Sequence, residues 1–289
     1  MKLVLSVILL AGALCANTSL ANDASQTVTW IRWDDPPIFI FSGPFQGQGL
    51  LDNTQRILIK NLPQYTHKTT QGSVPEVVQK GKDKSPICNA GWLETPEWSK
   101  IFYFSKPVFV IPTNGLLTKH DNLMELKSLV PLSLQKVIDQ KPQWTLGVGR
   151  LYGEGIDDVL IKNNYKKNPK IKVVDNSLLA HQMLHTGRIQ YTLGYPFEAF
   201  YYNKLLKSPG SVEYLPLKDN GDFVYVVVAC PKIEWGKKVI ESVDLVLNSR
   251  KVLEDIRHGV DRWLSINDQN GLIEARRKMV EKYYPDLTK

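Results

Sequence analysis

Histidine side chains at helical spacing are the first candidates for chemistry in this sequence. His181 and His185 lie four residues apart, a spacing from which one helix face could chelate zinc. The glutamate and the third ligand of the zinc-protease motif are absent, and the remaining histidines are far away in the sequence. The sequence also contains neither a G-x-S-x-G segment nor a phosphate-binding P-loop. We therefore predict no catalytic centre, no metal site and no cofactor, and we interpret both histidines as ordinary helix residues.

A glycine-rich turn offers a second kind of chemistry, the binding of an anion. Gly147-Val148-Gly149 ends a predicted strand, and Arg150 follows it just before a predicted helix. Backbone N–H groups of such a turn, helped by a guanidinium, can hold a carboxylate or a phosphate. Arg150 is therefore a candidate for contact with an anionic group of a ligand. A solvated surface arginine is the alternative.

The beginning of the chain has the three zones of a signal peptide. Lys2 gives a positive start, residues 3–14 are almost wholly apolar, and Ser19-Leu20-Ala21 supplies the small side chains that precede a cleavage site. The apolar run is shorter than the roughly 20 residues that span a bilayer. We expect a signal peptide over residues 1–21 and a soluble mature protein in the periplasm. An uncleaved anchor and a lipid on Cys15 are the alternatives.

The composition is that of an ordinary globular protein. Hydrophobic residues make up 43% of the chain and charged residues 22%. The formal net charge of +7 is spread over short, separate groups such as Lys166-Lys167 and Arg276-Arg277-Lys278. We interpret these groups as solvated faces, and we expect no nucleic-acid partner.

Short apolar runs alternate with segments of helical periodicity along the rest of the chain. The predicted strands are 28–33, 65–70, 87–92, 144–148, 171–174, 189–193 and 223–229. The predicted helices are 50–62, 74–81, one from about 156, 177–187, 237–247, 251–264 and 272–284, and Ser177 is expected to cap the fourth of them. Strands alternating with helices predict an α/β fold with mostly parallel sheets. Two such rounds suggest two lobes with a cleft between them, where ligands often bind.

Several motifs, taken in order, resemble the family 3 periplasmic solute-binding proteins, the group best known for polar amino acids. Pro36-Pro37-Ile38-Phe39 is similar to the loop after the family's first strand, and Gly49-Leu50-Leu51-Asp52 to the start of its first helix. Thr95-Pro96-Glu97-Trp98 followed by Phe104-Ser105-Lys106-Pro107 keeps the family's spacing of T-P-E-R, five residues, F-S-x-P. His185 to Gln190 resembles the A-A-G-R-x-D element. The resemblance covers nearly all of the mature chain and implies the type II periplasmic-binding fold.

The departures from the family pattern concern its charged ligand contacts. The resemblance implies that an arginine after T-P-E grips the α-carboxylate of the ligand, and Trp98 stands there instead. Gln190 replaces the aspartate that holds the α-amino group, and Asp35 replaces the aromatic residue before the two prolines. Tryptophan has one N–H donor and no charge, so it cannot substitute for a guanidinium. We therefore expect that an ordinary free α-amino acid is not the ligand.

The resemblance also implies which residues lie near the cleft. Aromatic rings combined with carboxylates suit a cationic or amphipathic solute, whereas Arg150 would receive an anionic group, and a zwitterion in a displaced pose would satisfy both. Packing in the core is the alternative role for the aromatic rings. Besides Arg150, the predicted contacts are Trp33, Asp35, Trp92, Thr95, Trp98, Tyr152, Gln190 and Tyr195, with Asp34 and Glu94 as acidic neighbours.

The two cysteines of the predicted mature chain gain a role from the same resemblance. In this architecture the strand that returns from the second lobe lies beside the third strand of the first lobe. Cys88 would lie on the third strand and Cys230 at the end of the returning strand. A disulfide between them and a pair of buried thiols are both possible at this point.

These observations predict a monomeric, two-lobed binding protein rather than an enzyme. Lobe 1 would comprise residues 22–112 plus 223–289, and lobe 2 residues 113–222. A small polar or amphipathic solute would close the hinge between the lobes, and the closed form would be read by the membrane subunits of an ABC importer or by a membrane sensor. A periplasmic enzyme of the dehydratase kind on the same fold is the alternative.

Overall fold

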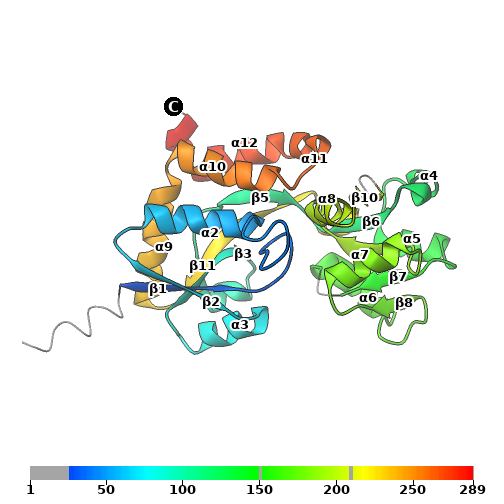
Figure 1. The fold of residues 1–289 in the computed structure, drawn as a ribbon, viewed down its shortest axis with the longest axis horizontal. Coiled ribbons are helices and arrows are strands. Elements are labelled where there is room, and N and C mark those ends of the chain that lie inside the picture. The colour runs from blue at the N-terminus through cyan, green and yellow to red at the C-terminus, as the bar shows by residue number, and fades with distance from the viewer. Residues whose placement is uncertain (1–25, 150–151, 208–210, 289) are drawn as a thin grey trace, which may run out of the picture.

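The computed structural model describes residues 26–149, 152–207 and 211–288, so the predicted signal peptide lies outside the described residues. Two bodies lie side by side, each built around one β-sheet and flanked by helices (Figure 1). We call the body that contains β1 lobe 1 and the body that contains β6 lobe 2. Within the described ranges, no helix has the length and apolarity needed to cross a bilayer.

The sheet of lobe 1 has the strand order β2-β1-β3-β11-β4, and β5 also pairs with β11. The β1–β2 and β1–β3 pairs are parallel, whereas β11 runs antiparallel to β3, β4 and β5. The sheet is therefore mixed, and β11 alone runs against the other strands. Its strands are β1 (Thr27–Arg32), β2 (Thr66–Gln71), β3 (Ile87–Leu93), β4 (Phe102–Phe104), β5 (Phe109–Pro112) and β11 (Phe223–Pro231).

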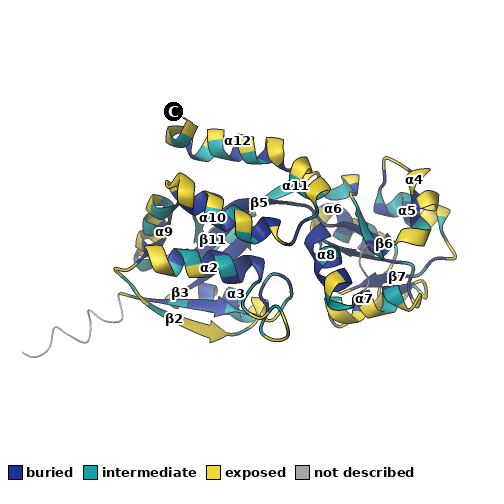
Figure 2. Ribbon diagram, turned by 45° about the horizontal axis from the view of Figure 1, so that its top comes forward, coloured by how far each residue is buried: buried dark blue, intermediate teal, exposed yellow. Residues whose placement is uncertain are grey.

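Amphipathic helices cover this sheet. On α2, for example, Leu50, Leu51, Thr54 and Leu58 are buried at helical spacing and face the core. Buried residues concentrate on β3, β11 and the inner faces of the helices, while the edge strand β2 is exposed (Figure 2). The helices of lobe 1 are α2 (Leu50–Asn61), α3 (Val74–Lys82), α9 (Glu234–Leu247), α10 (Arg250–Asp261), α11 (Ile266–Gly271) and α12 (Ile273–Tyr283), with short 3₁₀ turns η1 (Trp98–Lys100) and η4 (Pro285–Thr288).

The sheet of lobe 2 repeats this plan in the order β10-β6-β9-β7-β8. The β9–β7 and β7–β8 pairs are parallel, and β6 is the strand that runs against its neighbours. The predicted two-lobed α/β fold is confirmed, with one antiparallel strand in each sheet. The strands of lobe 2 are β6 (Gly115–Lys119), β7 (Leu146–Val148), β8 (Ile171–Val173), β9 (Tyr191–Gly194) and β10 (Val212–Leu215).

Five helices surround the second sheet, and side-chain caps fix where some of them begin. Asn176, rather than the predicted Ser177, caps α7, because its side-chain oxygen accepts from the backbone N–H of Leu179 at 2.9 Å. Ser177 is instead the first helical residue. The helices are α4 (Leu123–Lys127), α5 (Leu134–Gln140), α6 (Glu154–Lys162), α7 (Ser177–His185) and α8 (Pro196–Leu205), with 3₁₀ turns η2 (His120–Asn122) and η3 (Lys218–Asn220).

Two chain segments join the lobes. The first connection, residues 113–114, leads from β5 to β6, and the second connection, residues 216–222, leads from β10 to β11. Thr113 ties them together, because its hydroxyl donates to the carbonyl oxygen of Gly221 at 2.7 Å. Its own carbonyl accepts from the hydroxyl of Tyr214 at 3.1 Å. The two connections between the lobes are therefore hydrogen-bonded to each other.

Helix α8 of lobe 2 also packs directly against lobe 1. Tyr201 contacts Phe45 and Trp263 of lobe 1, with ring centroids 5.9 Å and 5.3 Å away. The hydroxyl of Tyr202 donates to the carbonyl oxygen of Pro36 at 3.4 Å. These side chains belong to the same buried cluster as the core of lobe 1. The lobes thus share an aromatic contact in addition to the two connections.

Cys88 and Cys230 form a disulfide inside lobe 1. Their Cα atoms are 4.4 Å apart on the neighbouring strands β3 and β11, and both side chains are fully buried. Disulfides persist in oxidising compartments and are rare in the cytosol of most organisms. The bond therefore indicates an extracytoplasmic location.

Candidate ligand-binding site between the lobes

A cavity of about 820 Å³ lies between the two lobes. This volume falls in the range of roughly 300–1,000 Å³ that is typical of small-molecule sites. Lobe 1 contributes the residues that follow β1 and the beginning of α3, and lobe 2 contributes turns and helix starts around its sheet. The lining residues are Trp33, Asp34, Asp35, Ser73, Val74 and Pro75 from lobe 1, and Gly149, Tyr152, Asp175, Asn176, Ser177, Ala180, His181, Thr192, Leu193 and Glu198 from lobe 2.

A buried aspartate fixes the loop that carries the acidic wall of lobe 1. One carboxylate oxygen of Asp52 accepts from the backbone N–H groups of Ile40 and Gly49, each at 3.0 Å. The other accepts from the guanidinium of Arg32 at 2.9 Å. Arg32 ends β1 and Gly49 precedes α2, so Asp52 is bonded to both ends of the loop between them, residues 33–49. This holds Asp34, at the start of the loop, in position.

Trp33 presents the aromatic surface of the same wall. Its ring packs edge-on against Phe39 at 5.7 Å and against Trp92 at 6.3 Å between centroids. Trp92 in turn packs edge-on against Trp98 at 5.9 Å. Among these three tryptophans only Trp33 lines the cavity, so Trp92 and Trp98 support its ring from behind.

Tyr152 forms the matching surface of lobe 2. Its hydroxyl accepts from the backbone N–H of Gly149 at 2.9 Å, and its own backbone N–H donates to Asp157 at 3.0 Å. Its carbonyl oxygen accepts from the side-chain amides of Asn114 at 3.1 Å and Asn220 at 2.5 Å. Those two asparagines lie on the first and second connections. Tyr152, which lines the cavity, is therefore hydrogen-bonded to both connections between the lobes.

Helix α7 brings a polar edge to the cavity. Ser177, Ala180 and His181 occupy positions i, i+3 and i+4 of this helix, and they therefore share one face. His181 is buried and its ring lies 4.2 Å from that of Tyr202. His181 therefore belongs to the cavity wall, in contrast to its interpretation as an ordinary helix residue.

Glu198 adds a buried carboxylate beside α7. Only 2% of this residue is exposed, and one of its carboxylate oxygens accepts from the backbone N–H of Tyr195 at 3.2 Å at the start of α8. A capping carboxylate at a helix start is stabilised by the positive end of the helix dipole. The same side chain lines the cavity.

The described lining residues are rich in carboxylates. They include four carboxylates, Asp34, Asp35, Asp175 and Glu198, and they include no lysine or arginine. Burial raises the pKa of the nearby Tyr201 hydroxyl, and the negative charge of Asp34 raises it further. In the described part of the chain, no three His, Cys, Asp or Glu side chains are grouped so that they could hold a metal ion.

The structure brings three of the predicted contact residues, Trp33, Asp35 and Tyr152, to the cavity, and it puts five others elsewhere. Arg150 lies outside the described residues. The side chain of Gln190 accepts from the backbone N–H of Thr145 at 2.8 Å and donates to the carbonyl of Gly187 at 3.2 Å, so it links the ends of two segments of lobe 2.

The other predicted residues also have structural contacts. The ring of Tyr195 stacks on Phe197 at 4.7 Å, next to the core of lobe 1. Thr95 accepts from the backbone N–H of Trp98 at 3.3 Å and lines a separate cavity that also includes Glu94. Trp92 and Trp98 lie behind Trp33 as described above.

Most of the lobe 2 wall, and Ser73 in lobe 1, were not predicted from the sequence. Ser73, Asn176 and Ser177 lie where helices begin after the parallel strands β2 and β8. In open α/β sheets, ligands bind at the carboxyl ends of parallel strands. Applied to each predicted strand–helix junction, that rule would have identified these residues as candidates for ligand contact.

Comparison with known proteins identifies the fold. No protein-family model matches the sequence, and no curated protein matches it. An ancestral cationic amino acid solute-binding protein superposes with a TM-score of 0.62 at 17% identity, covering 85% of this chain and 98% of the other. The substrate-binding protein of an amino acid ABC transporter gives a TM-score of 0.56 at 18% identity, with coverages of 82% and 98%.

A third similar structure is a histidine kinase sensor domain with similarity to periplasmic binding proteins. It superposes with a TM-score of 0.60 at 11% identity, covering 84% of this chain and 98% of the other. These neighbours are described as binding proteins and a sensor domain rather than as enzymes. The predicted resemblance is confirmed at the level of the fold. The chain has the type II periplasmic-binding fold, the two-lobed α/β architecture of amino acid solute-binding proteins and related sensor domains.

Proposed function

We propose that this protein is a periplasmic solute-binding protein that captures a small organic cation between its lobes. The observation that carries the proposal is the cavity of about 820 Å³ lined from both lobes. A solute held there contacts Trp33 and Asp34 on one side and Tyr152 and Asp175 on the other. A solute contacts both walls at once only when the lobes are closed. Binding therefore stabilises the closed arrangement by the free energy of the solute's contacts with the second wall.

The charge of the cavity supports a cationic ligand. Asp34 and Asp175 line it from opposite walls, and an organic cation can also lie against the rings of Trp33 and Tyr152. A cation–π contact contributes about 0.5–2 kcal/mol, which corresponds to roughly 2- to 30-fold in affinity. The structural neighbour described as a cationic amino acid solute-binding protein favours the same class of ligand.

We further propose that the ligand lacks an α-carboxylate. Trp98 occupies the position of the expected carboxylate-binding arginine and packs against Trp92, outside the cavity. An amine or guanidine without a carboxylate therefore suits this wall better than the corresponding amino acid.

The test compares two ligands that differ only in that carboxylate, agmatine and arginine, by calorimetry on the mature protein. We expect agmatine to bind more tightly, and we expect the dicarboxylate glutarate not to bind. Stronger binding of arginine or glutarate than of agmatine would reject the cationic, carboxylate-free ligand class. Conversion of agmatine to a new product would reject a purely binding role.

Variants test whether the binding uses this cavity. Asp34→Asn and Asp175→Asn each remove one carboxylate from opposite walls, and we expect each to weaken agmatine binding by about two- to fivefold. Trp33→Ala removes the ring and should cost more. Asp139→Asn is the matched control, because Asp139 is exposed on α5 and accepts only from Gln135. Equal effects of Asp34→Asn and Asp139→Asn would contradict the assignment of the site.

The proposed partner is a membrane protein that reads the closed form. One neighbour is the substrate-binding protein of an amino acid ABC transporter, and another is the sensor domain of a histidine kinase. Both kinds of partner would contact surfaces of the two lobes that come together only on closure. Cross-linking of agmatine-loaded protein to membrane extracts identifies which of the two partners binds.

A further inference from the structure

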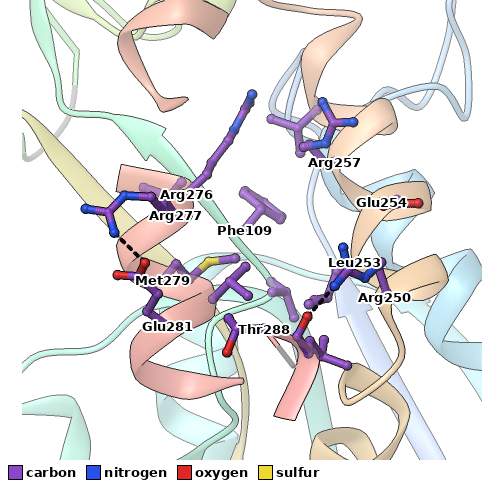
Figure 3. A pocket seen from close by; sticks show the side chains of 15 residues that line it. Phe109, Arg250, Leu253, Glu254, Arg257, Arg276, Arg277, Met279, Glu281 and Thr288 are labelled. Atoms are coloured by element: carbon purple, nitrogen blue, oxygen red, sulfur yellow. Dashed lines mark hydrogen bonds and ion pairs between the residues drawn. The ribbon is translucent and has the colours of Figure 1, made fainter. Parts of the chain in front are cut away.

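A second cavity, of about 450 Å³, lies within lobe 1 between α10, α12 and β5 (Figure 3). It shares no lining residue with the cavity between the lobes. Binding of a solute between the lobes does not use it.

Apolar side chains form the floor of this cavity. Phe109 comes from β5, Leu253 and Val260 from α10, and Met279 from α12, and each is less than 10% exposed. A ligand body that lies over them buries its own apolar surface against apolar side chains, which contributes roughly 25 cal/mol per Å² removed from water. The floor therefore suits an apolar body rather than a sugar or an amino acid.

Arginines surround the floor. Arg250 donates to the backbone carbonyl of Leu287, and no carboxylate of the described residues forms an ion pair with it. Glu254 follows on the same helix, but its carboxylate points away from Phe109 in Figure 3. Among the described residues, Arg250 is thus an arginine of the cavity without an ion-pair partner.

A second excess of positive charge lies at the other end of the floor. Arg257 and Arg276 share the single carboxylate of Asp261, and the Arg257 contact is 2.9 Å long. Figure 3 shows Phe109 between the side chains of these two arginines. Arg277 differs, because Glu274 and Glu281 both pair with it.

We propose that this cavity binds an amphipathic monoanion, a carboxylate attached to an apolar chain or ring. The apolar body lies over Phe109, Leu253 and Met279, and the carboxylate accepts from the guanidinium groups at the rim. Guanidinium groups bind carboxylates through paired N–H donors, an arrangement that supplies both charge and geometry. A neutral molecule of the same shape lacks that contact and binds more weakly.

The experiment uses decanoate as the probe and the methionine methyl groups as reporters. The chain has four methionines, of which Met279 lines this cavity and Met124 and Met183 belong to lobe 2. In protein labelled with ¹³C at the methionine methyls, decanoate should shift the Met279 signal in a saturable way and leave the other two in place. A Met279 signal that stays unmoved up to millimolar decanoate overturns the proposal.

Charge is tested with 1-decanol and with arginine variants. We expect decanol to bind at least tenfold more weakly than decanoate. Arg250→Gln should weaken decanoate binding by about tenfold and leave decanol binding unchanged, which also shows that the cavity is intact. Arg56→Gln is the matched control, because Arg56 is exposed and bonds only to Asn53 and the carbonyl of Gly47. Equal decanoate affinities in Arg250→Gln and Arg56→Gln overturn the proposal.

Discussion

The side-chain amide of Asn220 donates to the backbone carbonyl of Tyr152 at 2.5 Å, and this bond links the ligand cavity to a crossing between the lobes. Asn114 on the other crossing donates to the same carbonyl at 3.1 Å. Tyr152 itself lines the cavity. A ligand that shifts Tyr152 therefore acts on both connections at once.

Asn220→Ala tests this coupling. The substitution removes the bond to Tyr152 and also the acceptor for the backbone N–H of Ile156 at 3.3 Å. Each backbone group keeps one partner, because the Ile156 N–H also donates to the carbonyl of Gly153 at 3.1 Å and the Tyr152 carbonyl still accepts from Asn114. The loss of the two Asn220 bonds should therefore cost about 0.5–1.5 kcal/mol each, and we expect faster hydrogen exchange at the start of α6. Asn163→Ala is the control, because it loses two bonds within lobe 2 that lie outside the cavity. Unchanged exchange near Ile156 in Asn220→Ala would contradict the coupling.

Trp98→Arg restores the arginine expected after the T-P-E motif. We predict that this variant does not gain binding of free arginine, since residue 98 lies behind Trp92 and not on the cavity wall. We expect weaker agmatine binding instead, because the support of the Trp33 ring is loosened. Trp98→Phe keeps an aromatic contact and should retain binding. Tight arginine binding by Trp98→Arg, measured by calorimetry, would show that the family's ligand pose is preserved.

The disulfide predicts a large dependence of stability on redox conditions. It links Cys88 and Cys230 across a sequence separation of 142 residues. Closing a loop of that size in the unfolded chain stabilises the fold by about 3–5 kcal/mol. We expect the double variant Cys88→Ser, Cys230→Ser and the reduced wild type to unfold at similar, lower denaturant concentrations. A reductant that lowers the stability of the double variant as well would mean that its effect does not come from this bond.

The sequence allowed the architecture to be predicted better than the site. Long apolar or amphipathic segments such as β11 and α2 were predicted within two residues at each end, because their burial is expressed in local periodicity. The strands β6 and β10 and the helix α8 were missed. The two strands are only four or five residues long, and α8 is buried on several sides, so it has no polar face to reveal its period.

The site depends on contacts between segments that are far apart in the sequence. Trp33 could be predicted because the resemblance to the family implies that the end of the first strand lies near the cleft. Glu198 and His181 could not, since their approach to the cavity requires α7 and α8 to pack at a particular angle. The side chain of Gln190 is another example, because its contacts with Thr145 and Gly187 depend on the neighbouring turn rather than on its position in a motif.

The aromatic contact between the lobes leads to a last prediction about their relative motion. Tyr201 of α8 lies against Phe45 and Trp263 of lobe 1, and the amino group of Lys204 lies 5.2 Å from the centroid of the Phe45 ring. These contacts favour the arrangement of the lobes in which they form. We expect Tyr201→Ala to lower stability by about 3–5 kcal/mol, as for other buried aromatic truncations, and to widen the range of distances between the lobes.

Spin labels at Lys60 of α2 and Asp139 of α5, both exposed, measure that distance range by pulsed electron resonance. Tyr165→Ala is the matched control, because Tyr165 packs against the core of lobe 2 and its loss should lower stability without changing the distances. An unchanged distribution in Tyr201→Ala would mean that the two connections alone set the arrangement of the lobes. A wider one, narrowed again by agmatine, would mean that the aromatic contact and the ligand stabilise the same closed form.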